Sequence, residues 1–185
     1  MSSILLVAGS PSAPSRTAAL LDYASRYLDQ RSFVTETLHV RDLDATELIY
    51  GKFDGASIVP AVQQVASAAG IVVATPVYKA AYTGVLKTFL DLLPHHALAG
   101  KVVLPIALGG SYAHSLVIDY ALRPVLAALG AAHVTDGLYL LDKQIEHEMG
   151  RFLGFAGADI ENQVHVGLDQ FIEAIQRQHS EWKGV

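Results

Sequence analysis

Short hydrophobic runs alternate along the chain with segments whose hydrophobic residues recur at helical spacing. Residues 4–8 form a continuous apolar run, which is typical of a strand buried on both faces of a parallel sheet. Residues 33–39 alternate more and predict an outer strand. Three further strands are predicted over residues 71–74, 101–108 and 134–141.

Between these strands the hydrophobic residues recur every three or four positions, which is the period of an amphipathic helix. The pattern predicts helices at about 20–28, 57–69, 85–93, 113–129 and 164–179. Ser57 is expected to cap the second of these helices, with Pro60 in its first turn. Residues 41–57 and 142–163 show no pattern that assigns them a structure or a role.

Strand and helix therefore alternate five times, which predicts a parallel sheet with helices on both faces. Five strands favour a flavodoxin-like three-layer sandwich with strand order 2-1-3-4-5 over a six-stranded dinucleotide fold. The whole chain, residues 1–185, fits one such domain. Pro105 conflicts with this assignment, because a proline inside a central strand removes a ladder hydrogen bond. Either a bulge at Pro105 or a shorter strand would accommodate it.

The amino-acid composition of the chain excludes several classes of protein. Hydrophobic residues make up 51% of the chain and charged residues 17%, which excludes a disordered composition. The net charge of −5 argues against a nucleic-acid surface, and the apolar tracts are too short to span a membrane. Cysteine is absent, and the histidines lack metal-ligand spacing. We therefore expect a cytoplasmic protein without a metal site.

Three loops at the carboxyl ends of neighbouring strands carry the candidate chemistry, because ligands of such sheets bind there. The first loop precedes a helix and contains a cluster of polar residues: Ser10, Ser12, Ser15, Arg16 and Thr17. Hydroxyls, a guanidinium and free N–H groups at a helix start suit a phosphate. An ordinary capping loop is the alternative. The chain has neither G-x-G-x-x-G nor a P-loop motif here, which argues against those two sites.

The second loop, with Thr75, Pro76, Val77 and Tyr78, could flank a flat heterocycle with its side chains and meet its polar edge with backbone groups. The alternative is a turn in which Tyr78 covers the core. The third loop, Gly109, Gly110 and Ser111, has glycines that let the backbone approach a ring closely. One ligand could contact all three loops.

Together these segments resemble the NAD(P)H-dependent FMN reductase family. The resemblance rests on residues 9–17, 75–78, 86–91 and 109–111, and it extends over nearly all of residues 1–140. Residues 117–126 resemble the reductase component of two-component alkanesulfonate monooxygenase systems. The wider family often has an arginine where this chain has Ser12, and Arg16 is the candidate replacement.

The resemblance implies a homodimer or homotetramer that reduces FMN with NADPH or NADH and releases it to a partner monooxygenase in organosulfur utilisation. The twelve residues named in the three loops are then cofactor-binding, with the first loop at the phosphate and the other two at the ring. Hydride passes directly between the cofactors, so no catalytic acid–base residue is expected. An FMN-retaining quinone or azo reductase, a flavodoxin-like electron carrier and a flavin-free phosphate-binding regulator are the alternatives.

Pro124 lies inside a predicted helix, where its missing N–H leaves the carbonyl of Tyr120 without a partner. A π-bulge at Tyr120 would relieve that defect, and such bulges are frequent at functional sites. In the reductases that the chain resembles, the matching tyrosine is associated with a bulge at a subunit interface near the flavin. Tyr120 and Pro124 are therefore expected to tune flavin exchange through oligomer packing. A simple proline kink with a buried Tyr120 is the alternative.

Overall fold

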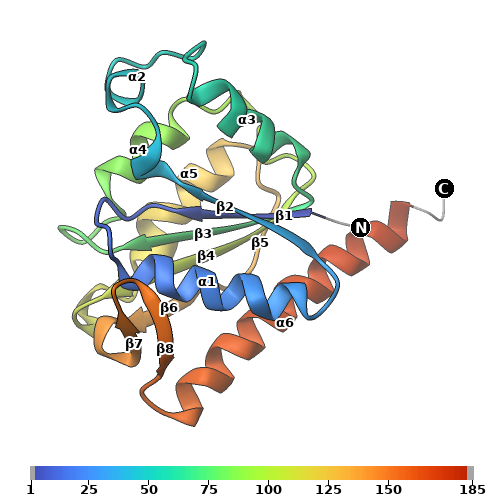
Figure 1. Ribbon diagram of the computed structural model, residues 1–185. Helices are drawn as coiled ribbons and strands as arrows, with labels where there is room; N and C mark the ends of the chain where they lie inside the picture. The colour runs from blue at the N-terminus through green and yellow to red at the C-terminus, as the bar shows by residue number, and fades with distance from the viewer. Residues whose placement is uncertain (1–2, 183–185) are drawn as a thin grey trace.

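A parallel β-sheet forms the middle layer of the molecule in the computed structural model, which describes residues 3–182 (Figure 1). Its strands are β1 (Ser3–Ala8), β2 (Val34–His39), β3 (Gly70–Pro76), β4 (Val102–Gly109), β5 (His133–Val134) and β6 (Leu138–Leu141). The order is β2-β1-β3-β4, with β5 and β6 both paired to β4. The predicted flavodoxin-like order 2-1-3-4-5 is confirmed, with its fifth position filled by two short strands.

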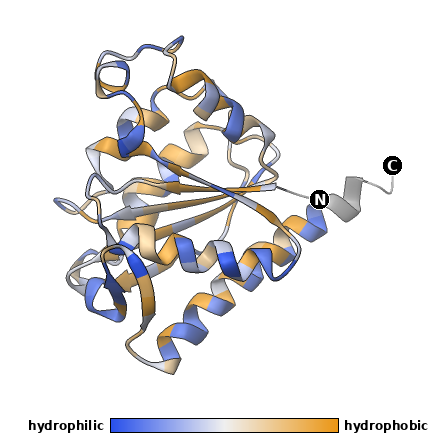
Figure 2. Cartoon of the chain, viewed as in Figure 1, coloured by the Kyte–Doolittle hydropathy of each residue, from blue (hydrophilic) through white to orange (hydrophobic). Residues whose placement is uncertain are grey.

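Helices cover both faces of the sheet (Figure 1). α1 (Arg16–Asp29) and α6 (Ala158–Trp182) cover one face, and α3 (Ile58–Ser67), α4 (Gly84–Leu90) and α5 (Arg123–Ala128) cover the other. Residues of β1 alternate between the two cores: Leu6 packs toward α1 and α6, and Leu5 toward α3 and α4. This burial on both faces explains the unbroken hydrophobic run, and hydrophobic residues line the inner layers in Figure 2.

The segment before α3 folds around the carboxylate of Glu47. This residue lies on a short helix, α2 (Ala45–Ile49), and its oxygens accept hydrogen bonds from Ser57 Oγ at 2.6 Å and from the N–H of Ala56 at 2.9 Å. The hydroxyl of Ser57 holds the pKa of Glu47 below its usual value. Ser57 occupies the N-cap of α3 as predicted, with Pro60 in the first turn, but its side chain bonds to Glu47 and makes no capping hydrogen bond to the helix.

β4 runs unbroken through Pro105, and the irregularity lies in the neighbouring strand. The N–H of Thr135 donates to the carbonyl of Val103 at 2.9 Å. Peptide groups alternate sides along a strand, so Pro105 presents its nitrogen toward the same neighbour. That neighbour is interrupted between β5 and β6, opposite Pro105, and the proline therefore removes no ladder bond. The predicted single strand over 134–141 is wrong for this reason.

Arg123 holds the interruption in place. Its guanidinium donates to the carbonyl oxygens of Val134 at 3.0 Å, Thr135 at 3.0 Å and Asp136 at 3.3 Å. These carbonyls would otherwise lack strand partners, and buried backbone groups are rarely left unpaired. The side chain of Arg123, from α5, thus replaces part of the backbone hydrogen bonding that is lost between β5 and β6.

The segment predicted as one helix over 113–129 is divided into three parts. A 3₁₀ turn spans Tyr112–His114, a π-helix spans Ile118–Leu122, and α5 follows. The N–H of Arg123 donates to the carbonyl of Ile118, which is the five-residue spacing of a π-helix. The predicted widening at Tyr120 is confirmed, and the Tyr120 side chain is 80% exposed instead of buried.

The chain after β6 forms a hairpin before it enters α6. Strand β7 (Ile145–Glu148) pairs antiparallel with β8 (Arg151–Phe155), and both pack on α1. α6 starts earlier and ends later than the predicted 164–179. Within residues 3–182, no helix has the length and hydrophobicity required to cross a bilayer.

Candidate functional site

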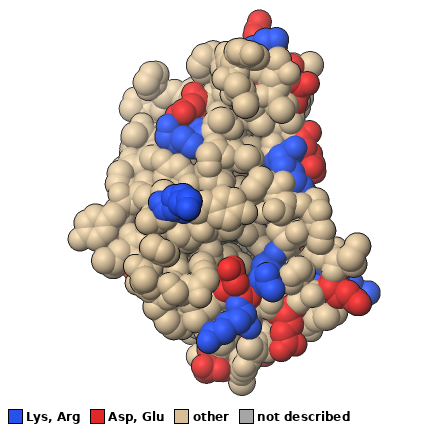
Figure 3. Space-filling model, turned by 90° about the vertical axis from the view of Figure 1, so that its left-hand side faces the viewer, with Lys and Arg blue, Asp and Glu red and all other residues tan. Residues whose placement is uncertain are grey.

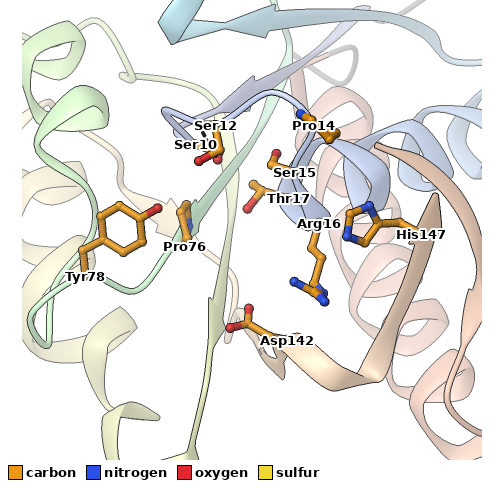
Figure 4. A pocket seen from close by; sticks show the side chains of 10 residues that line it. All are labelled: Ser10, Ser12, Pro14, Ser15, Arg16, Thr17, Pro76, Tyr78, Asp142 and His147. Atoms are coloured by element: carbon orange, nitrogen blue, oxygen red, sulfur yellow. Dashed lines mark hydrogen bonds between the residues drawn. The ribbon is translucent and has the colours of Figure 1, made fainter. Parts of the chain in front are cut away.

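A cavity of about 210 Å³ opens at the carboxyl edge of the sheet, between the β1–α1 loop, the end of β3 and the β7–β8 hairpin (Figure 4). Ten residues line it: Ser10, Ser12, Pro14, Ser15, Arg16, Thr17, Pro76, Tyr78, Asp142 and His147. They include all five residues predicted from the first loop and two of the four predicted from the second. Two of the three loops predicted to meet at this edge therefore line one cavity.

The first loop both caps α1 and leaves donors for a ligand. Ser15 is the N-cap, and its Oγ accepts a hydrogen bond from the N–H of Ala18 at 3.1 Å. Ser10 Oγ accepts from the N–H of Ser12 at 3.2 Å, which shapes the loop before the helix. The first N–H groups of the helix, at Arg16 and Thr17, have no carbonyl to bond within it. These groups and the helix dipole favour an anion in the cavity.

Arg16 supplies positive charge to this cavity. Its side chain extends between His147 and Asp142 in Figure 4, and it forms no hydrogen bond or ion pair with any side chain that the structure describes. Ser12, where the wider family often has an arginine, contributes its carbonyl to a 2.6 Å hydrogen bond from Arg41. Arg16 and Ser12 thus line the same cavity, and Arg16 brings a positive charge to it.

The second loop is a tight turn beside the cavity. Tyr78 and Ala81 exchange backbone hydrogen bonds of 2.9 and 3.1 Å, and Lys79 and Ala80 between them have φ of +51° and +62°. Left-handed conformations are uncommon for residues other than glycine, and such backbone strain gathers at functional sites. The Tyr78 side chain is 49% exposed, so it lies over the site edge instead of covering the core.

Thr75 and Val77 support this turn without lining the cavity. Thr75 is fully buried, its hydroxyl donating to the Pro76 carbonyl at 2.9 Å and accepting from the N–H of Thr83 at 3.2 Å. Val77 is half-buried and packs on a small cluster that includes Ile118. The turn is thereby joined to the π-helix by packing.

The third loop begins at Gly109, the last residue of β4, and lies next to Pro76, since β4 pairs with β3, but it does not line the cavity. Tyr139 on β6 donates its hydroxyl hydrogen to the carbonyl of Ser111 at 2.6 Å. A Cβ on Gly109 would collide with that same hydroxyl. The lack of a side chain at Gly109 therefore leaves room for the Tyr139 hydroxyl. Gly110, the middle residue of this loop, is exposed.

Three of the residues that line the cavity were not predicted from the sequence. Pro14 lies in the first loop but has no polar group, and Asp142 and His147 belong to the segment that showed no pattern. The turn glycine Gly150, between two short strands, was the available sign of a hairpin there. Its docking on α1 could not be anticipated, because it depends on contacts between residues more than a hundred positions apart.

The surface at this edge combines uncharged areas with charge at its margins. In Figure 3, where the carboxyl edge of the sheet faces the viewer, tan surface occupies much of the centre, and most charged side chains gather at the right and bottom. The cavity itself contains serine and threonine hydroxyls, one arginine, one histidine and helix N–H groups, with the carboxylate of Asp142 on its wall. This donor set, beside Pro76 and Tyr78, fits a phosphate monoester joined to a flat heterocycle.

The comparisons with known proteins agree with that fit. The model of a family described as NADPH-dependent FMN reductase matches residues 2–146. An FMN reductase (NADPH) of Pseudomonas putida is 42% identical over 174 residues, covering 94% of this chain and 88% of the relative. The Escherichia coli protein of the same description is 40% identical over 176 residues, covering 94% and 90%.

A solved structure extends the likeness to three dimensions. The apo form of an NADH:FMN oxidoreductase (EMOB) superposes with a TM-score of 0.82 at 41% identity, covering 92% of this chain and 88% of that one. The family match spans most of the chain, and the relatives match it over almost their full length. This chain therefore belongs to the NADPH-dependent FMN reductase family.

Proposed function

We propose that this NAD(P)H-dependent FMN reductase releases its reduced flavin to a separate flavin-dependent monooxygenase that acts on alkanesulfonates or related organosulfur compounds. The observation that carries the proposal is the small size of the cavity. At about 210 Å³ it lies below the roughly 300–1,000 Å³ of pockets that bury a whole ligand. A flavin held by its phosphate, with its ring at an open edge, can leave after reduction.

The residues of this chain would bind and orient the cofactor. Arg16 and the N–H groups at the start of α1 would hold the phosphate, and Pro76 and Tyr78 would flank the ring. Gly109 to Ser111 would lie at the pyrimidine side, where backbone N–H groups stabilise negative charge. The bound flavin and nicotinamide supply the hydride chemistry, so the protein contributes position and electrostatics.

The exposed Tyr120 on its π-helix supports a second part of the proposal. A large aromatic side chain that is 80% exposed suits an interface, and Val77 of the second loop packs against a cluster that includes Ile118 of the same π-helix. We expect the chain to act as one cytoplasmic reductase domain in a homodimer or homotetramer, with Tyr120 and Pro124 tuning flavin exchange. A Tyr120→Ala variant that keeps the wild-type oligomeric state, flavin affinity and turnover would rule this part out.

Steady-state oxidation of NADH and NADPH with FMN, FAD and riboflavin tests the main proposal, run beside a flavin-binding titration. The protein should purify largely colourless, bind FMN reversibly and turn over free FMN. Flavin that stays bound through dilution and gel filtration would instead favour an FMN-retaining quinone or azo reductase. The same assays decide between NADH and NADPH.

Arg16→Ala should weaken FMN binding by about tenfold or more, because a charge-assisted contact to the phosphate is lost. Arg26→Ala, on the same helix in an exposed pair with Asp22, is the matched control and should leave the affinity unchanged. Equal affinities in the two variants would place the phosphate elsewhere.

A further inference from the structure

We propose that His147, on the β7–β8 hairpin, is a further phosphate-recognition residue, whose Nδ1 donates a hydrogen bond to the phosphate of FMN. The hairpin then makes the site prefer phosphorylated flavin to riboflavin. This inference rests on the proposed placement of FMN in the cavity and adds a specificity-determining residue from a distant part of the chain.

The side chain of His147 lines the cavity beside Arg16 and Pro14 (Figure 4). Its Nδ1 atom is buried and has no hydrogen-bond partner among the residues that the structure describes. Buried polar atoms are nearly always paired, and an unpaired one costs free energy. A phosphate oxygen in the cavity would supply the missing acceptor.

The tip of the hairpin touches the loop that begins α1. Gly150 has φ of +83°, and a Cβ built on it would lie 3.0 Å from Pro14 Cβ and 3.7 Å from the backbone nitrogen of Ser15. A side chain at this position would be strained and would push against the first loop. Because the tip is fitted to Pro14, the position of His147 relative to the helix start is set by backbone packing.

The body of the hairpin is anchored by an aromatic cluster. The rings of Phe152 and Phe155 lie 4.7 and 4.9 Å from the ring of Tyr23 on α1. The Tyr23 hydroxyl in turn bonds with His165 Nε2 and Glu161 on α6. His147 is therefore carried by a hairpin that is packed against two helices.

The charges around the cavity explain why a bound phosphate would need a hydrogen bond from His147. Arg16 brings one positive charge, and Asp142, on the opposite side in Figure 4, brings one negative charge. These two formal charges cancel, so a phosphate dianion depends on further donors for its oxygens. The N–H groups at the start of α1 provide some of these donors, and the imidazole of His147, on the β7–β8 hairpin, provides another.

The test is a fluorescence titration of the full chain with FMN and with riboflavin, using His147→Ala, His147→Gln and His147→Asn. The amide nitrogen of asparagine lies near the place of Nδ1, whereas that of glutamine lies near Nε2. We expect His147→Ala and His147→Gln to weaken FMN binding by about tenfold or more. His147→Asn should recover most of the affinity, and riboflavin binding should change less than about twofold in every variant.

His133→Ala is the matched control, because His133 is exposed at the amino end of β5, on the opposite edge of the sheet. Unchanged riboflavin binding also reports that each variant is folded. Three results would overturn this inference and leave the proposed placement of FMN standing. The first is full FMN affinity in His147→Ala, and the second is an equal loss of affinity for FMN and riboflavin. The third is an equal loss of FMN affinity in His147→Asn and His147→Ala. A wild-type protein that binds FMN no better than riboflavin overturns the placement of the phosphate as well.

Discussion

The hydroxyl of Tyr139 donates a hydrogen bond to the carbonyl oxygen of Ser111 across 2.6 Å. Tyr139 lies on β6 and Ser111 follows β4, so this bond ties the loop proposed to face the flavin ring to the outermost strand of the sheet. Burial is the main cause that raises the pKa of Tyr139, and the phenol keeps its proton at neutral pH.

Tyr139→Phe should loosen the loop over 109–111 while it keeps the packing of the ring. We expect the dissociation constants of FMN and riboflavin to rise together, by about fivefold, because one hydrogen bond of about 1 kcal/mol is lost on the ring side. Fluorescence titration measures both constants. A loss confined to FMN would assign Tyr139 to the phosphate side and contradict the placement of this loop.

Gly109→Ala should displace the Tyr139 hydroxyl and break its bond to Ser111, since the added Cβ claims the same space. The unfolding free energy should fall by about 1–3 kcal/mol, as is usual for overpacking. Tyr139→Phe should then add little to the effect of Gly109→Ala, and urea denaturation of both single variants and the double variant measures that coupling. Strictly additive effects would show that the two positions do not interact.

Arg123→Met should destabilise the junction between β5 and β6, because three backbone carbonyls lose their donor. We expect a loss of about 1–3 kcal/mol in unfolding free energy and faster hydrogen exchange over 134–138. Arg26→Met, which removes an exposed pair with Asp22, should change stability by less than about 0.5 kcal/mol. Comparable losses in both variants would mean that the Arg123 contacts contribute nothing specific.

Stability should fall in strongly alkaline solution through Tyr23. Burial, followed by the charge of Glu161, raises the pKa of Tyr23 to about 12 from an ordinary value of 10.0. Because the folded-state pKa is the higher one, the contribution is complete below pH 10 and is lost as the pH rises from about 10 toward 12. Tyr23→Phe should flatten this part of the pH profile of urea unfolding.

Tyr50→Phe serves as the control for that measurement, because the Tyr50 side chain is 76% exposed. It should leave the slope between pH 10 and 12 as it is in the wild type. Parallel profiles for Tyr23→Phe and the wild type would show that Tyr23 does not carry the effect.

The features that were predictable from sequence depend on local pattern. Leu5 and Leu6 in one unbroken run predicted a strand buried on both faces, and Pro124 predicted the widening at Tyr120. The hydroxyls of the first loop and Arg16 at the helix start predicted a polar site, and these residues do line one cavity, because caps and helix starts are local structures. Each of these inferences used residues within a few positions of one another.

The features that escaped prediction depend on contacts between distant residues. The interruption at Thr135 relies on the side chain of Arg123 and on the position of Pro105 across the strand pair. His147 reaches the cavity only because the hairpin docks on Tyr23, and the periodicity of one segment does not reveal its partner. Ser57 occupies the N-cap of α3 as expected, but its hydroxyl bonds with Glu47 on a different helix instead of with an N–H of α3.

The interruption between β5 and β6 also affects how copies of this chain can assemble. These two short strands form one outer edge of the sheet, and an edge that presents a long row of free peptide groups invites strand addition from another chain. Here the row is broken at Thr135, and Arg123 occupies the carbonyls of the break. Sheet extension is therefore blocked on this side, and any association there has to use helices such as the one that carries Tyr120.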